Sequence, residues 1–183
     1  MSYVATDVLI MGCGDIGERV GVLERSEGRH VTGLVRSEIS VGRLFAAGIQ
    51  PITADLDVPA ALNNLPVKGA VVYYFVPPPG KGAVEPRMEA FINVLNPSNF
   101  PKRVVYISTT GVYGDCAGEW VTEDRPPHPR ADRAKRRLAA ENTLRHWSEK
   151  NRVPIVILRV SGIYARGLLP EKVIRLFPQE IVD

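Results

Sequence analysis

The stretch VLIMGCGDIG, residues 8–17, decides how this chain folds, because an apolar run leads directly into three glycines spaced as GxGxxG. In such a loop the first glycine permits a tight turn, the second lets the backbone approach a diphosphate, and the third lets strand and helix pack closely. The start of the following helix adds amide donors and the positive end of its dipole. We therefore predict a strand, a phosphate-binding loop and a helix, with contacts from Gly12, Gly14, Asp15, Ile16 and Gly17.

Apolar runs and helical stretches alternate along the rest of the chain. We expect strands over residues 8–11, 30–35, 49–53, 70–76, 103–108 and 154–159. We expect helices over residues 16–25, 42–47, 84–95 and 132–150. Nearly continuous apolar strands of this kind suit a parallel sheet that is covered on both faces. The pattern predicts one α/β domain over residues 1–183, a doubly wound Rossmann fold, in which residues 161–183 begin an abbreviated C-terminal substrate region.

The composition excludes several classes of protein. The net charge of +3 is scattered, apart from residues 130–137, so we expect no nucleic-acid partner. No apolar run is long enough to cross a membrane and no leader is evident, which favours a cytoplasmic protein. Cys13 and Cys116 are too few for a disulfide scaffold or a zinc site, so we expect no metal. The expected partner is a small molecule, and a homodimer stays open.

The ends of the next strands suggest which dinucleotide is bound. An Asp or Glu at the end of the second strand usually binds the ribose of NAD, but this chain has Arg36 and Ser37 there. A guanidinium and a hydroxyl suit a 2′-phosphate, which predicts NADP(H), with NAD(H) as the alternative and a solvated Arg36 as the other interpretation.

Further cofactor contacts are expected at the ends of the third and fourth strands. Asp55 and Leu56 follow the third strand and could meet the adenine, although Asp55 could equally be a turn former. Val76 and Pro77, where the fourth strand closes, complete the predicted contacts with the cofactor.

Four motifs together resemble the NAD-dependent epimerase/dehydratase family, in the extended and atypical short-chain dehydrogenase/reductase superfamily. They are GCGDIGERV at 12–20, Asp55-Leu56, YISTTGVYG at 106–114 and LRVSGIY at 158–164. The resemblance implies an NAD(P)-dependent oxidoreductase or epimerase/dehydratase acting on a sugar or a nucleotide-sugar-like substrate. It also implies that Thr109 corresponds to the catalytic Ser or Thr, which hydrogen-bonds the reacting oxygen of the substrate.

The chain departs from this family at its acid/base pair, a Tyr four residues before a Lys. In the aligned helix Arg133 stands at the Tyr position and Arg137 at the Lys position. A guanidinium does not exchange its proton near neutral pH, so Arg133 is no substitute acid. The two arginines, at i and i+4, could together hold a phosphate or carboxylate, or simply form a solvated basic face. Tyr113 is a candidate acid, with loop packing as its other interpretation.

Three functions therefore remain open from the sequence. The leading hypothesis is an NAD(P)-dependent oxidoreductase or epimerase/dehydratase. A non-catalytic NADP(H)-binding sensor or scaffold is the alternative that the missing Tyr favours. A third possibility is a fragment that folds but binds its cofactor weakly.

Overall fold

A parallel six-stranded sheet forms the centre of the described part of the chain. The structure is a computed structural model that describes residues 7–82 and 84–163. The strands are β1 (Val8–Met11), β2 (Val31–Val35), β3 (Gln50–Thr53), β4 (Val71–Tyr74), β5 (Arg103–Thr109) and β6 (Ile155–Val160). They pair in the order β3-β2-β1-β4-β5-β6, and every pair is parallel. The doubly wound α/β fold expected from the sequence is confirmed, and each strand begins within one residue of its predicted start.

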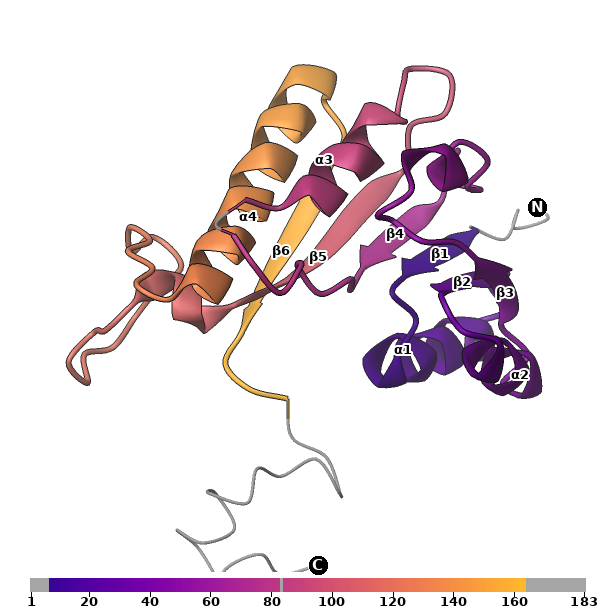
Figure 1. The fold of residues 1–183 in the computed structure, drawn as a ribbon, viewed down its shortest axis with the longest axis horizontal. Helices are drawn as coiled ribbons and strands as arrows, with labels where there is room; N and C mark the ends of the chain where they lie inside the picture. The colour runs from indigo at the N-terminus through magenta and orange to yellow at the C-terminus, as the bar shows by residue number, and fades with distance from the viewer. Residues whose placement is uncertain (1–6, 83, 164–183) are drawn as a thin grey trace, which may run out of the picture.

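Helices cover both faces of this sheet. They are α1 (Asp15–Ser26), α2 (Glu38–Ala46), α3 (Pro86–Asn93) and α4 (Asp132–Asn151), with short 3₁₀ turns η1 (Pro59–Leu62) and η2 (Thr110–Tyr113). In Figure 1, α3 and α4 lie side by side over β4 to β6, whereas α1 and α2 lie on the other side of the sheet, near β1 to β3. Helix α2 begins four residues before its predicted start because the hydroxyl of Ser37 caps it, accepting from the amide of Ser40 at 3.3 Å.

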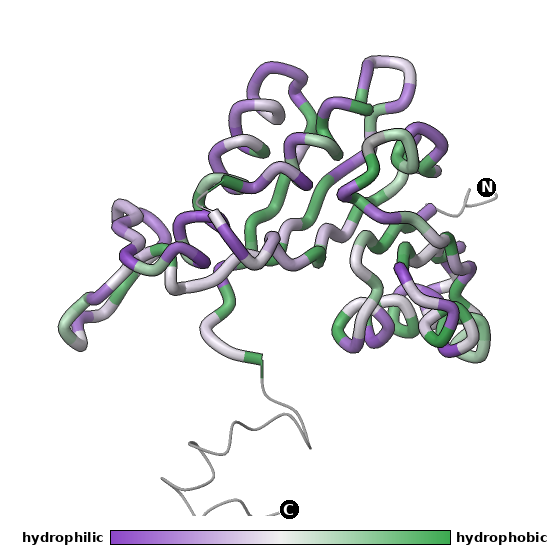
Figure 2. Tube along the Cα trace, in the orientation of Figure 1, coloured by the Kyte–Doolittle hydropathy of each residue, from purple (hydrophilic) through white to green (hydrophobic). Residues whose placement is uncertain are grey.

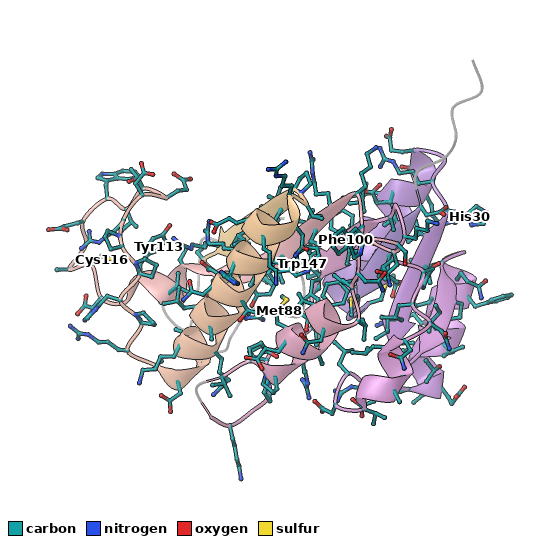
Figure 3. All side chains as sticks on the ribbon, turned by 90° about the horizontal axis from the view of Figure 1, so that it is seen from above. His30, Met88, Phe100, Tyr113, Cys116 and Trp147 are labelled. Atoms are coloured by element: carbon teal, nitrogen blue, oxygen red, sulfur yellow. The ribbon has the colours of Figure 1, made fainter. Side chains whose placement is uncertain are left out.

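Two hydrophobic clusters fill the space between the sheet and the two layers of helices. Neighbouring residues of a strand point to opposite faces, so Leu9 joins one cluster and Ile10 the other. Trp147 belongs to the larger cluster, and the partly buried Phe100 packs against it edge to face, with ring centroids 5.6 Å apart (Figure 3). In Figure 2, which colours the chain trace by hydropathy, hydrophobic residues are prominent along β5 and β6. The ends of the strands are thereby held in fixed positions.

Residues 114–128 form a projecting loop between η2 and α4 that extends away from the body of the domain (Figure 1). Its two ends are held together, because the amide of His128 donates to the carbonyl of Val112 at 2.9 Å. Gly114 has a φ of +77°, and a Cβ there would lie 2.3 Å from the carbonyl oxygen of His128. Trp120 within the loop is 99% exposed. The side chain of Trp120 thus contributes nothing to packing within the described residues.

Two expectations concern the chain as a whole. Over the described residues, none of the helices combines the length and the apolar character needed to cross a membrane. Of the substrate region expected at 161–183, residues 164–183 lie outside the described residues.

A buried ion pair ties α4 to the far half of the sheet. The carboxylate of Glu141 is fully buried and accepts hydrogen bonds from the hydroxyl of Ser108 and the guanidinium of Arg159, the latter at 2.7 Å. The hydrogen bonds to Glu141 raise the pKa of Arg159, whose guanidinium also lies 4.7 Å from the ring centroid of Tyr113. These contacts fix β5, β6, α4 and η2 relative to one another.

Removing the charge of Glu141 should therefore destabilise the protein. Breaking a buried ion pair leaves its partner charged and poorly solvated, so we expect Glu141→Gln to lower the free energy of unfolding by about 3 kcal/mol. Glu149→Gln, an exposed site on the same helix, serves as the control and should change it by less than about 0.5 kcal/mol. Urea denaturation followed by circular dichroism measures both. Equal stability of the two variants would contradict the structural role of the pair.

Candidate functional site

A cavity of about 750 Å³ opens at the carboxyl ends of the strands. It extends from the loop after β1 to the ends of β5 and β6. The strand order reverses between β1 and β4, and ligands of open α/β sheets bind at this switch point. Residues from every part of this edge line the cavity: Gly12, Cys13, Gly14, Asp15, Ile16, Gly17, Leu34, Val35, Arg36, Ser37, Ser40, Leu56, Phe75, Val76, Pro77, Arg87, Ile107, Ser108, Thr109, Arg137, Val160, Ser161, Gly162 and Ile163.

The three glycines of the GxGxxG motif lack a side chain for different physical reasons. Gly12 has a φ of +78°, and a Cβ there would lie 2.8 Å from the amide nitrogen of Val76. Gly17 packs closely, since its Cβ would lie 3.0 Å from a methyl carbon of Ile10. By contrast, a Cβ on Gly14 would meet no atom within 4 Å. Gly12 and Gly17 are thus required by packing, whereas the bare backbone of Gly14 faces open space in the cavity.

The start of α1 offers hydrogen-bond donors to that space. Gly14 is the N-cap residue and provides no side chain to cap the helix. The first amides of a helix have no acceptor within it, so those of the first turn remain available. The carboxylate of Asp15 pairs with Arg19 at 3.1 Å. The loop therefore presents amides and a positive helix end, which suits an anion such as a diphosphate.

Cys13 belongs to the packed base of the loop. Its side chain is 1% exposed, and burial is the main reason that the pKa of its thiol rises to about 12. Its carbonyl accepts a hydrogen bond from Arg43 at 3.3 Å, and Arg43 also pairs with Glu18 at 2.7 Å. The thiol thus stays protonated at neutral pH, and α2 supports the loop through Arg43.

Two arginines line the cavity on the side of β2 and β3. Arg36 follows β2 and is exposed. Arg87, from α3, pairs with Asp57 through two hydrogen bonds of 2.7 and 2.6 Å and also donates to the carbonyl of Pro77 at 2.9 Å. The hydrogen bond from Arg87 lowers the pKa of Asp57. Sequence reasoning missed Arg87, although Pro86, a typical first helical residue, marks the turn that carries it to this edge.

The predicted pair Asp55-Leu56 divides in the structure. Leu56 is buried and lines the cavity. Asp55 is exposed and lies outside the cavity lining, where its carboxylate accepts from the amide of Asp57 at 3.0 Å. Asp55 thus serves as a turn former, which was the other interpretation of this residue.

Thr109 lies at the opposite end of the cavity, where β5 ends. Its hydroxyl oxygen accepts from the amide of Gly111 at 3.2 Å. Tyr113 follows one turn later, but it is 8% exposed, lies beside the Arg159 guanidinium and does not line the cavity. The structure therefore places Thr109 in the cavity lining and Tyr113, labelled in Figure 3, outside it.

Arg133 and Arg137, the two arginines of α4 that were expected to act together, are also separated. Arg137 is half-buried in the cavity wall, and its Nη1 lies 3.1 Å from the carbonyl oxygen of Ile107 and 3.3 Å from the hydroxyl of Tyr106. Arg133 is exposed and outside the lining. Arg133 precedes Arg137 by about one helical turn, or about 5.4 Å along the helix axis, and so lies beyond the ends of the strands. The joint grip on an anion expected from the i, i+4 spacing does not form in the described cavity.

Comparisons with known proteins agree with this geometry. A family model described as the NAD dependent epimerase/dehydratase family matches residues 8–182. A structure from Methylobacillus flagellatus, provisionally described as an NAD-dependent epimerase/dehydratase, is 32% identical with a TM-score of 0.72, over 93% of this chain and 59% of that one. UDP-glucuronic acid 4-epimerase from Bacillus cereus in complex with NAD is 22% identical with a TM-score of 0.69, over 87% and 57%, and shows the shared fold.

A shorter match joins the chain to a curated protein. The dTDP-D-glucose 4,6-dehydratase of Mus musculus is 34% identical over 76 residues, which are 42% of this chain and 21% of that protein. The matched part of this chain therefore covers about a fifth of the dehydratase, and the chain covers less than two thirds of the structures named above.

Gly14 permits a test that separates binding from folding. We expect Gly14→Ala to weaken the binding of NADPH and NADH at least about tenfold, because its methyl group would occupy the space in front of the helix amides. Its melting temperature should stay within about 2 °C of the parent protein, since that space is open. Gly42→Ala, an exposed glycine of α2 outside the cavity lining, is the matched control and should bind normally. Unchanged affinity in Gly14→Ala, measured by cofactor fluorescence, would exclude this loop as the binding site.

Proposed function

The chain belongs to the NAD-dependent epimerase/dehydratase family, and from this premise we propose that it binds NADP(H) across the cavity as an oxidoreductase or epimerase/dehydratase. We propose a sugar or nucleotide-sugar-like molecule as its substrate. The observation that carries the proposal is the open space at Gly14, bordered by uncapped amides of α1 and continuous with the cavity that ends at Thr109.

The preference for NADP(H) over NAD(H) rests on Arg36. Within the described residues, Arg36 makes no hydrogen bond or ion pair, and it lines the cavity beside Ser37 and Ser40 at the start of α2. A guanidinium near two hydroxyls and a helix start supports a 2′-phosphate. The nearby carboxylate of Asp57 is engaged by Arg87 and so competes little for Arg36.

Thr109 is the residue proposed to orient the reacting oxygen. When bound, the cofactor supplies a nicotinamide ring that exchanges hydride with the substrate. The hydroxyl of Ser108 donates to Glu141 and so has no proton to offer. The oxygen of Thr109 accepts from Gly111, which leaves its own O–H free to donate to a substrate hydroxyl or carbonyl.

A non-catalytic NADP(H)-binding protein is the second candidate, and one observation favours it. The ionisable side chains that line the described cavity are Cys13, Asp15, Arg36, Arg87 and Arg137. A guanidinium is a poor proton donor, burial raises the pKa of the Cys13 thiol to about 12, and Asp15 pairs with Arg19, so none of the five is placed as an acid or base for a substrate. A binding protein needs no proton transfer, whereas an enzyme would take its acid or base from elsewhere.

Arg36→Ala tests the assignment of the 2′-phosphate. We expect its affinity for NADPH to fall at least about tenfold, because a charge-assisted contact is lost, while its affinity for NADH changes less than about twofold. Parallel fluorescence titrations of the two reduced cofactors measure the difference. Equal losses for both would refute the assignment.

A search for hydride exchange separates the two candidate functions. We expect the protein with NADP⁺ to oxidise or isomerise members of a panel of nucleotide sugars, and Thr109→Val to reduce that rate about a hundredfold while cofactor affinity stays unchanged. Absorbance at the reduced-nicotinamide band and chromatography of the sugars follow the reaction. Normal cofactor binding without turnover of any sugar would favour the non-catalytic candidate.

A further inference from the structure

The cavity has an excess of positive charge at the ends of β4 and β5, where Arg137 lies. The Nη1 of Arg137 has three neighbours within hydrogen-bond distance, the carbonyls of Ile107 and Val76 and the hydroxyl of Tyr106, at 3.1, 3.4 and 3.3 Å. All three are uncharged oxygens, since burial raises the pKa of the Tyr106 phenol. Among the described residues, no carboxylate lies within 4 Å of this guanidinium.

The carboxylates nearest to this region are already engaged. Glu141, one turn further along α4, is held by Arg159 and Ser108. Glu85, before α3, is buried and accepts from the amide of Arg87, and burial is the main cause that raises the pKa of its carboxyl group. Asp15, the carboxylate in the described lining, belongs to the loop after β1 and pairs with Arg19. None of these three carboxylates forms an ion pair with Arg137, whose hydrogen-bond partners are uncharged oxygens.

The fold determines which part of a dinucleotide would meet that charge. A dinucleotide crosses the point of strand reversal with its diphosphate at the start of α1. Arg36 at the end of β2 marks the adenosine side, so the nicotinamide side lies toward β4, β5 and Arg137. The oxidised ring carries a positive charge and the reduced ring carries none, whereas the phosphates and both riboses are the same in the two forms.

We propose that Arg137 makes this site selective for the reduced cofactor, so that NADPH binds more tightly than NADP⁺. This inference rests on the proposed function only in requiring that the cavity binds a nicotinamide dinucleotide. At an effective dielectric constant of about 20, one unit charge within about 10 Å of the ring changes the ratio of the two dissociation constants by at least about tenfold. A tenfold ratio corresponds to a midpoint potential of the bound couple about 30 mV more positive than that of the free couple.

The test compares the ratio Kd(NADP⁺)/Kd(NADPH) in the parent protein and three variants. We expect a ratio of at least about ten in the parent protein, a fall toward about one in Arg137→Gln, and a value close to the parent in Arg137→Lys, which keeps the charge. Lys135→Gln removes a charge from an exposed position of the same helix, outside the cavity lining, and should leave the ratio unchanged. NADPH is titrated by fluorescence and NADP⁺ by its displacement of bound NADPH.

The ratio distinguishes the inference from the proposed function. A general loss of affinity or partial unfolding weakens both forms alike and cancels, and melting curves verify that each variant is folded. Failure of the parent protein to bind NADPH would overturn both the proposed function and this inference. Normal binding with the same ratio in Arg137→Gln as in the parent would overturn the inference alone. An equal fall in Arg137→Lys and Arg137→Gln would also overturn it, because it would assign the effect to geometry instead of charge.

Discussion

The close approach of Gly12 to the backbone of Val76 is the constraint on which the site depends. The turn after β1 and the end of β4 meet so closely that a methyl group would lie 2.8 Å from a main-chain nitrogen. This contact occurs where the strand order reverses, so it sets the floor of the cavity between the two halves of the sheet. The same turn leads the chain into α1, whose first amides have no side-chain cap. The loop is thus shaped by main-chain packing more than by any side chain that it carries.

A buried ion pair stabilises the opposite wall of the cavity. Glu141 sits without solvent exposure between Ser108 and Arg159, and thereby joins α4 to the last two strands. Because Ser108 is engaged there, its neighbour Thr109 is the hydroxyl that remains available at the end of β5. The same helix places Arg137 one turn earlier, against carbonyls and a phenol. One helix therefore carries both an ion-paired charge, which stabilises the fold, and a charge in the cavity wall that has no ion-pair partner among the described residues.

Local periodicity was enough to predict the strands and the loop after β1, because each of them is determined by a short continuous stretch of sequence. The side chains that reach the cavity were harder to predict, because this depends on where each helix starts and how it lies on the sheet. Arg133 and Arg137 share a spacing, yet one turn of helix separates an exposed guanidinium from one in the cavity wall. Arg87 was missed for the same reason, as its pairing with Asp57 joins residues 30 positions apart. For Asp55 and Tyr113 the structure adds contacts, with the amide of Asp57 and the guanidinium of Arg159, that a linear pattern does not contain.

The projecting loop at residues 114–128 has a consequence for how such a domain can diversify. Its two ends are joined by a backbone hydrogen bond between Val112 and His128, close to the sheet. The sequence between these ends can therefore lengthen, shorten or be exchanged without moving the strand that precedes it. New recognition residues can therefore evolve in this loop, as they do in the hypervariable loops of binding scaffolds, while the fold beneath the loop stays the same.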